Sequence, residues 1–208
     1  MNEPRILIVE DDEIVAAVVS ERLKQLGYQP AGLAVSGDQA IALAGELRPD
    51  LVLMDIRLEG EMDGISAAQE IRQRFHIPSV FLSAYSEEAT IERAKLAEPF
   101  GYILKPFEGR EVRANIEMAL YKHRMEEDLR EKEASYHTLA DSGMALIWTS
   151  GTDKKCDYFN LPWLKFTGRT LEQQLGDGWA EGVHPDDLAR GFKIYTEAFD
   201  RRESFSMD

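Results

Sequence analysis

The sequence predicts an α/β protein with a doubly wound, five-stranded parallel sheet, followed by a long connecting helix and a smaller, partial α+β region. Over residues 1–122, short apolar runs alternate five times with segments of helical periodicity. Most of these runs are continuous, which is typical of strands buried on both faces between two helix layers. After Ser142–Gly143 the composition changes, and all three tryptophans of the chain lie there.

The predicted strands consist mainly of β-branched and aliphatic residues. The second of them is the weakest. The five segments are Arg5–Val9, the region near Gln29–Val35, Leu51–Met54, Ser79–Leu82 and Tyr102–Leu104.

A segment with helical spacing follows each strand. Apolar residues from Ile14 to Leu26 recur at intervals of three and four, and Gly27 is a natural stop. Ser36 is suited to cap the next helix, and Pro49 lies beyond its end. The remaining helices are expected after Asp63, after Ser86 and after Glu108.

The fifth helix is expected to continue to about Tyr136, because residues 118–136 contain no glycine or proline. Acidic residues precede basic ones by four positions, which favours a helix. A thin apolar stripe on a charged helix suits a two-helix seam, although Asp128 and Lys132 interrupt it. The segment is therefore either a dimer-forming coiled coil or a solvated connecting helix. The stripe consists of Met118, Tyr121, Met125, Leu129 and Tyr136.

The region after Gly143 is expected to begin with a hairpin and to continue with helices. The hairpin pairs Ala145–Thr149 with Asp157–Asn160 across a turn-rich connection. In the segment HPDD, residues 184–187, the proline and the two aspartates suit the first turn of a longer helix. Two short helices are expected around Pro162–Phe166 and Thr170–Leu175, and a final strand around Ser204–Met207.

The charge balance excludes several kinds of partner. The chain has 24 Lys and Arg against 38 Asp and Glu, a net charge of −14, so it repels nucleic acid and anionic membranes. Its single cysteine, Cys156, excludes an intrachain disulfide and a multi-cysteine zinc site. The sequence contains no apolar run long enough to span a bilayer and no signal peptide, so we expect a cytoplasmic protein.

Acidic, hydroxyl and lysine side chains directly follow four of the predicted strands. Glu10 and Asp11 follow the first strand, Asp55 the third, Ser83 the fourth and Lys105 the fifth. Ligands of open parallel sheets bind at the carboxyl ends of the strands, so these side chains can share one pocket. Clustered carboxylates repel one another unless a cation joins them, and hard oxygen ligands suit Mg²⁺. Each residue alone is an ordinary cap or turn residue; the set at four strand ends predicts a site for a small dianion beside Mg²⁺.

The stretches LIVEDD, LVLMDIRLEGEMDG, VFLSAYS and GYILKPF resemble the response-regulator receiver domain of two-component signalling, over about residues 4–122. The resemblance implies a flavodoxin-like fold and makes Asp55 the phosphoacceptor, which takes a phosphoryl group from a phosphohistidine. It implies that Ser83 and Lys105 contact the phosphoryl oxygens. The resemblance also implies that Tyr102 and Ser83 are the switch residues, whose side chains move when Asp55 is phosphorylated. The Lys105–Pro106 bond is expected to be cis.

The same resemblance implies a Mg²⁺ site. Asp11 and Asp55 would bind the ion directly, together with the backbone carbonyl of Arg57, and Glu10 would act through water. The loop RLEGEMDG after Asp55 is longer and more acidic than in the shortest receivers.

The patterns FNLPWLKFTGRTLEQQLGDGW and VHPDDL resemble a PAS domain, over about residues 134–208. The family has a five-stranded antiparallel sheet, and this chain ends about where the third strand would begin, so we expect an incomplete domain with an exposed sheet edge. No flavin or haem is expected, because Cys156 lacks the photoactive motif and His184 suits a helix start. Trp163 and Trp179 are interpreted as core anchors. His76, His123 and His137 show no metal-ligand spacing.

These features predict three parts: a receiver domain over residues 1–122, a helical linker over 123–137 and an incomplete PAS domain over 138–208. The expected function is that of a phosphoacceptor in a phosphorelay, not of an enzyme acting on other substrates. The expected partners are a sensor histidine kinase or phosphotransfer protein and a second copy of the chain, bound through the linker helix or the PAS part, with no nucleic acid and no membrane. The alternative is an N-terminal fragment of a larger hybrid sensor kinase or other multidomain signalling enzyme.

Overall fold

The computed structural model describes residues 3–83 and 99–206, and its internal contacts divide the chain into two units, residues 1–128 and 129–208. The helix expected after Ser86 lies outside the described residues. Among the helices that are described, none is long and apolar enough to span a membrane.

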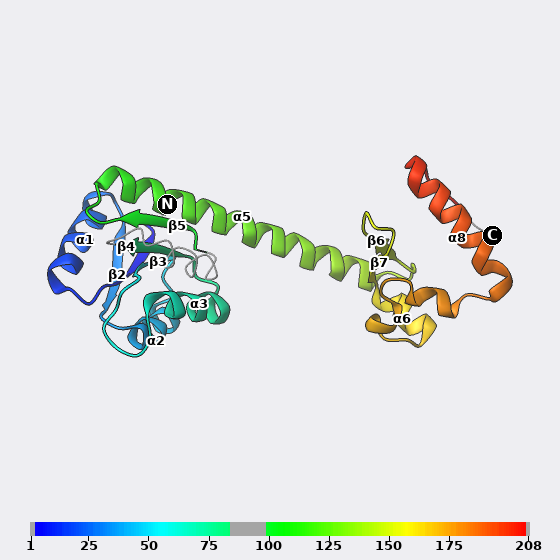
Figure 1. The fold of residues 1–208 in the computed structure, drawn as a ribbon, viewed down its shortest axis with the longest axis horizontal. Coiled ribbons are helices and arrows are strands. Elements are labelled where there is room, and N and C mark those ends of the chain that lie inside the picture. The colour runs from blue at the N-terminus through cyan, green and yellow to red at the C-terminus, as the bar shows by residue number, and fades with distance from the viewer. Residues whose placement is uncertain (1–2, 84–98, 207–208) are drawn as a thin grey trace. The chain divides into compact units, whose positions relative to one another are not determined.

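The first unit, which lies at the N-terminal end of α5 (Gly109–Ser142) in Figure 1, is built on a parallel sheet. Its strand order is β2-β1-β3-β4-β5. All neighbouring strands pair in parallel, as predicted. The predicted ends differ from the observed ends by one residue at most. The strands are β1 (Arg5–Val9), β2 (Gln29–Ala34), β3 (Leu51–Asp55), β4 (Ser79–Ser83) and β5 (Gly101–Leu104).

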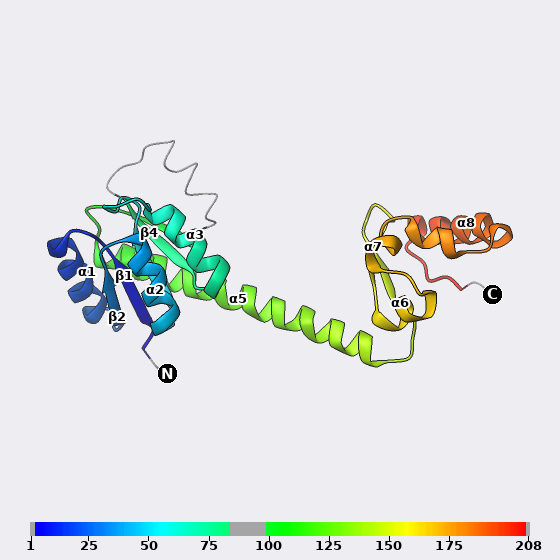
Figure 2. The ribbon, with the colours of Figure 1, turned by 90° about the horizontal axis from the view of Figure 1, so that it is seen from below.

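Helices cover both faces of this sheet, so the doubly wound arrangement is confirmed (Figure 2). On one face, α2 (Gly37–Leu47) and α3 (Gly64–Phe75) pack against side chains such as Leu7 and Phe81. On the other, α1 (Glu13–Gln25) and the first turns of α5 (Gly109–Ser142) pack against Ile8 and Leu82. Because successive side chains of a strand point to opposite faces, each strand contributes to both cores.

Polar side chains cap the first three helices of this unit. The Asp12 carboxylate accepts hydrogen bonds from the backbone of Ile14 and Val15, and Ser36 and Asp63 cap α2 and α3 in the same way. Each cap satisfies a backbone N–H that the first helical turn leaves unpaired. Asp12 therefore differs from its neighbours Glu10 and Asp11, because its carboxylate caps α1.

Helix α5 continues past the predicted end near Tyr136 and reaches Ser142. Val112, Ile116 and Ala119 on its first turns are buried in the first unit. The apolar stripe of the same helix is exposed: the exposed fraction is 70% for both Met118 and Tyr136, and 58% for Leu129.

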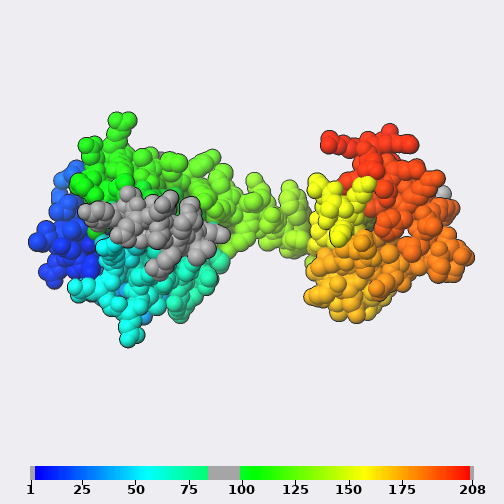
Figure 3. All heavy atoms as spheres, in the orientation of Figure 1, coloured from blue at the N-terminus to red at the C-terminus, as the bar shows by residue number. Residues whose placement is uncertain are grey.

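The second unit contains a hairpin and helices near the predicted positions, but the first strand begins at Trp148, three residues later than expected. Strands β6 (Trp148–Ser150) and β7 (Cys156–Phe159) pair antiparallel. The His184 imidazole accepts a hydrogen bond from the backbone of Asp186 and caps α8, as predicted from HPDD. In Figure 3 the yellow to red atoms of this unit form one packed body. Its other elements are α6 (Leu161–Thr167), α7 (Leu171–Gln174), the short 3-10 helix η1 (Gly178–Gly182) and α8 (Pro185–Arg201).

The predicted strand at Ser204–Met207 is wrong for its described part, because residues 204–206 form no strand. An extended segment becomes a strand only when another strand pairs with it. Here Phe205 packs its ring 5.8 Å from the ring of Tyr195 on α8 instead.

Candidate functional site

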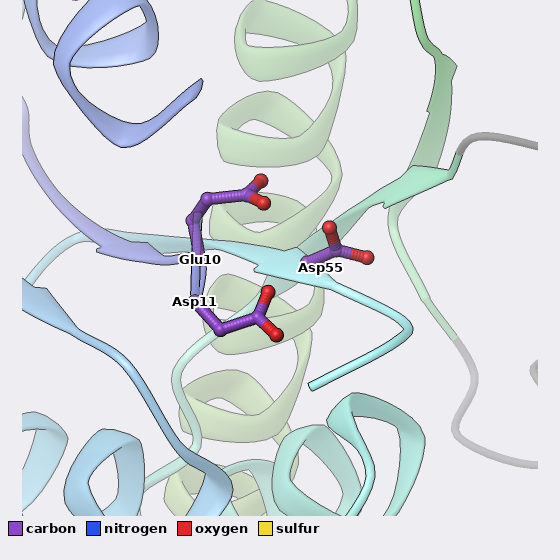
Figure 4. Close-up of side chains that lie close together, drawn as sticks. All are labelled: Glu10, Asp11 and Asp55. Atoms are coloured by element: carbon purple, nitrogen blue, oxygen red, sulfur yellow. The ribbon is translucent and has the colours of Figure 1, made fainter. Parts of the chain in front are cut away.

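The predicted site residues meet at the carboxyl ends of four adjacent strands. Glu10 and Asp11 directly follow β1, Asp55 ends β3, Ser83 ends β4, and Lys105 follows β5. Figure 4 shows Glu10, Asp11 and Asp55 close together, and each offers a carboxylate oxygen within 4.8 Å of the others. Of the residues that the structure describes, these three form the only group of acidic, histidine or cysteine side chains with that spacing.

Lys105 joins two of these carboxylates. Its Nζ donates a hydrogen bond to Glu10 Oε2 at 2.6 Å and a second one to Asp55 Oδ2. Its backbone N–H donates to the carbonyl oxygen of Ser83 at 2.7 Å, which fixes the start of the loop beside β4. The Lys105–Pro106 bond is cis, as expected. One ammonium group therefore partly neutralises two acids that come from different strands.

The loop after β3 supplies backbone donors to the same cluster. The N–H of Arg57 donates to Asp55 Oδ1 at 2.9 Å, so both oxygens of Asp55 accept hydrogen bonds. The N–H of Glu59 donates to Asp11 Oδ2 at 3.2 Å. The role of the Arg57 carbonyl as a metal ligand stays a prediction.

Burial strongly perturbs Glu10, whose exposed fraction is 2%. Desolvation, opposed by the hydrogen bond from Lys105 and assisted by the negative charge of Asp55, raises the pKa of Glu10 to about 7. Burial alone would lower the pKa of Lys105, but its hydrogen bonds to Asp55 and Glu10 outweigh burial and raise it. The site therefore holds a firmly protonated lysine beside an acid that titrates near neutral pH.

The switch candidates lie next to this cluster. Ser83 is buried at the end of β4. Tyr102 is partly buried, and its ring lies 5.6 Å from that of Phe81 in the core beneath the site. The role of Tyr102 and Ser83 as a switch stays a prediction.

Other histidines and tryptophans that the sequence singled out end a helix or pack against aromatic rings. His76 ends α3 in the left-handed conformation, His123 lies against Phe100, and His137 lies against Tyr158. Trp163 packs against Phe159 and Trp179 stacks on Phe192.

Sequence reasoning missed Gly64, the first residue of α3. A Cβ atom at this position would lie 1.8 Å from the carbonyl oxygen of Asp55, so only glycine lets α3 begin this close to the site. The signal was present in the sequence, because a glycine directly after the capping Asp63 is a poor helix former where alanine would suit.

We expect Gly64→Ala to lower the free energy of unfolding of the first unit by about 3 kcal/mol, because the new methyl group overlaps backbone atoms that cannot move independently. Urea denaturation followed by circular dichroism measures this loss. Gly109→Ala is the matched control: it also changes the first residue of a helix, and its methyl group meets only the flexible side chain of Arg22. Equal stability losses in the two variants would contradict the role assigned to Gly64.

An open parallel sheet whose strand ends gather three acids, a hydroxyl and a lysine defines a signalling receiver, a class that takes up a phosphoryl group on an aspartate. The sequence profile of the response regulator receiver domain matches residues 6–117, and the chain belongs to this family. It thus contains a receiver domain of a response regulator in two-component signalling. Receiver domains bind Mg²⁺ through acidic residues, and Glu10, Asp11 and Asp55 form such a cluster here.

Curated relatives agree with this assignment. The chain is 38% identical over 120 residues to the transcriptional regulatory protein PdtaR of Mycobacterium tuberculosis, and this match covers 58% of each chain. It is 35% identical over 127 residues to the regulatory protein AtoC of Escherichia coli, covering 61% of this chain and 27% of AtoC. The chain therefore spans less than two thirds of the length of these relatives, which are regulators.

Solved structures show the same fold. The signal receiver domain of a modulated diguanylate cyclase from Desulfovibrio desulfuricans superposes with a TM-score of 0.58 at 37% identity, covering 60% of this chain and 98% of that one. The N-terminal domain of a response regulator/sensory box/GGDEF protein from Carboxydothermus hydrogenoformans gives 0.54 at 35% identity, covering 59% and 98%.

Proposed function

We propose that Asp55 is the phosphoacceptor of a phosphorelay and takes its phosphoryl group from a histidine kinase or a phosphotransfer protein. The observation that carries this proposal is the setting of Asp55: a carboxylate at a strand end, bound by the Lys105 ammonium and the Arg57 N–H and flanked by Glu10 and Asp11. Such a carboxylate is positioned as a nucleophile, with one ammonium group beside it for the phosphoryl oxygens and two acids that can hold a cation.

In the proposed transfer, an Asp55 oxygen forms a bond to phosphorus while the bond from phosphorus to the donor's histidine nitrogen breaks. The released imidazole keeps the electron pair of that bond and takes a proton from solvent. Lys105, and the hydroxyl of Ser83, stabilise the equatorial phosphoryl oxygens. Mg²⁺, when bound, supplies further charge neutralisation; Asp11, Asp55 and the Arg57 carbonyl would hold it directly, and Glu10 through water. Tyr102 and Ser83 would change their side-chain conformations when Asp55 is phosphorylated.

Incubation with Mg²⁺ and acetyl phosphate tests the proposal. We expect mass spectrometry of the intact chain to show the addition of one phosphoryl group, which tandem fragmentation places on Asp55. A chain that gains no phosphoryl group, although its circular dichroism shows that it is folded, would contradict the proposal.

We expect the Mg²⁺ affinity of the site to fall as the pH falls from 8 to 6. Glu10 has a pKa of about 7 without the ion, so its protonated fraction rises through this range and competes with the cation. Isothermal titration calorimetry at pH 8, 7 and 6 measures the change. In Glu10→Gln the dependence should flatten over the same range; an equally steep dependence in that variant would show that another group titrates.

The raised pKa of Glu10 also fixes the sign of its effect on folding. The folded chain binds more protons at Glu10 than the unfolded chain between pH 4.5 and 7, so this group favours the folded state at the acidic end and loses that contribution as the pH rises.

We further propose that the second unit is a PAS-type sensory and dimerisation module, with residues 123–137 as the linker that carries the receiver's state to it. The resemblance of its sequence patterns and the hairpin followed by short helices support this proposal. The alternative, a fragment of a larger hybrid kinase or another multidomain signalling enzyme, keeps the same role for Asp55.

We expect the chain to dimerise through the exposed stripe of α5. Met125, Leu129 and Tyr136 are 46%, 58% and 70% exposed, and apolar residues at this spacing are typical of a two-helix seam. Multi-angle light scattering with and without beryllofluoride measures the mass. Leu129→Glu should shift the chain towards monomer, whereas Glu127→Gln on the same helix should not; a monomer under both conditions would contradict the seam.

A further inference from the structure

The last turns of α5 contact the rest of the second unit without burying a side chain. The structure describes all of residues 129–142 of this helix, and none of them is buried. The C-terminal end of the helix nevertheless lies beside β7 and α6 (Figure 1). Buried apolar packing therefore does not fix the position of the helix end, and hydrogen bonds take this role.

The side chain of Asn160, at the junction of β7 and α6, joins three segments of the second unit. Its exposed fraction is 0%. Its Nδ2 group donates to the carbonyl oxygen of Ala140 on α5 at 2.7 Å and to that of Ala145 at 2.9 Å. Its Oδ1 atom accepts from the backbone N–H of Ile147, directly before β6, at 2.9 Å and from that of Trp163 in α6 at 3.2 Å. One buried amide thus links the end of α5 to the hairpin and to α6.

These four hydrogen bonds use the full capacity of the Asn160 amide, which has two N–H donors and an oxygen with two lone pairs. The carbonyl oxygen of Ala140 belongs to the last turn of α5 and has no partner within the helix, so Asn160 satisfies it. A buried polar group that loses a partner costs free energy. A displacement of Ala140 is therefore less costly when the amide, and with it Ile147 and Trp163, moves as well.

Asp141 provides a second link at the same place. Its Oδ1 atom accepts a hydrogen bond from the backbone N–H of Leu161, the first residue of α6, at 2.7 Å and a longer one from the Tyr158 hydroxyl at 3.5 Å. The ring of His137, one turn earlier on α5, lies 4.7 Å from the ring of Tyr158. An acidic residue is unfavourable in the last turn of a helix, because that end carries partial negative charge. The contact with α6 therefore explains the position of Asp141 better than the stability of α5 does.

We propose that Asn160 couples the end of α5 to the hairpin and to α6, so that a change in the last turns of the helix is passed to the backbone of Ile147 and Trp163. This inference rests on the proposed role of residues 123–137 as a linker, and it names the residue that receives the state of that linker. Such coupling is a free energy shared by two sites, and it acts in both directions.

The coupling can be measured without phosphorylation. Ala134→Gly, at an exposed position of α5, weakens the last turns of the helix because glycine is a poor helix former. We expect amide hydrogen exchange in the full chain, followed by nuclear magnetic resonance, to become at least about threefold faster at Ile147 and Trp163. Exchange at Cys156, whose N–H pairs with the carbonyl oxygen of Gly176 away from this contact, should stay unchanged.

Two substitutions of Asn160 cut the link to α5. Asn160→Asp replaces the donating Nδ2 group by an oxygen, which as a carboxylate cannot donate to Ala140, while the other oxygen still accepts. Asn160→Ser is the second variant, because serine is an equally good cap for α6 and lacks the amide nitrogen. In either background Ala134→Gly should no longer change the exchange of the two amides. Ala189→Gly, the same change at an exposed position of α8, is the matched control and should not change it either.

Beryllofluoride with Mg²⁺ tests whether the receiver uses this coupling. In the unchanged chain we expect altered exchange at amides near Asp55 and also at Ile147 and Trp163. In Asn160→Asp only the amides near Asp55 should respond. If these fail to respond in both chains, the proposed role of Asp55 is contradicted, and the comparison of Ala134→Gly with and without Asn160 still decides the role of Asn160.

Three results would overturn the proposal. One is unchanged exchange at Ile147 and Trp163 in Ala134→Gly, in a chain that retains Asn160. Another is equal acceleration with and without Asn160, or in Ala189→Gly, which would indicate general opening of the second unit. The third is a response to beryllofluoride that is present near Asp55 and absent at the two amides in the unchanged chain.

Discussion

Asp55→Asn should gain no phosphoryl group from acetyl phosphate, with a rate at least about 1,000-fold below that of the unchanged chain. The amide has nearly the same shape as the carboxylate, and its oxygen can still accept the hydrogen bond that Arg57 donates to Asp55. It is not a nucleophile at neutral pH, however, so the bond to phosphorus cannot form. Time-resolved mass spectrometry in Mg²⁺ measures the loss.

Asp12→Asn is the matched control for this experiment. Asp12 lies only one residue beyond the acidic cluster but caps α1, and asparagine is an equally good cap. We expect this variant to be phosphorylated at the normal rate. Phosphorylation of Asp55→Asn would contradict the proposed role of Asp55. Its loss in Asp12→Asn would contradict the assignment of Asp12 to capping alone.

Lys105→Met should destabilise the first unit by about 3 kcal/mol at pH 8, because it leaves the nearly buried Glu10 and Asp55 carboxylates without their shared ammonium partner. The loss should be smaller at pH 6. Glu10 already has a pKa of about 7 with Lys105 present, and it can take up a proton more readily when that charge is gone. Hydrogen exchange in peptides that cover β1 and β3 measures the stability of this unit by itself.

The same variant should lose phosphorylation about 100-fold, the usual effect of removing one group that stabilises transition-state charge. Added Mg²⁺ should restore stability more in Lys105→Met than in the unchanged chain, since the ion supplies the missing positive charge. Lys24→Met, at an exposed position on α1, is the control and should change stability by less than about 0.5 kcal/mol. A larger loss of stability at pH 6 than at pH 8 would show that the unneutralised carboxylates of Glu10 and Asp55 are not its cause.

The fold of the first unit could be predicted because its strands are short, continuous and apolar, and because capping residues such as Ser36 and Asp63 mark the helix starts. These signals are local. The strand expected at Ser204–Met207 failed because strand formation depends on a distant partner, and the alternation of residues in one segment carries no information about that partner.

The site was predictable for a similar reason. Glu10, Asp55 and Lys105 each follow a recognisable strand, and the geometry of a parallel sheet brings strand ends together. Gly64 was visible in the sequence as an unfavourable residue at a helix start, but the reason for it was not, because the close approach of α3 to the Asp55 backbone appears only in the three-dimensional structure. A cavity in the second unit was also missed: Trp163 and Trp179 were interpreted as core anchors, and they do pack against Phe159 and Phe192, but the same rings enclose an open space.

The distribution of tryptophan has a practical consequence for following the signal. Residues 1–147 contain none, so light absorbed by indole is absorbed within residues 148–179 alone. Phosphorylation of Asp55 adds no chromophore and alters no indole directly. A shift of the emission spectrum on phosphorylation would therefore be a label-free optical record that the chemical state of one unit has reached the other, and its time course would give the rate of that communication.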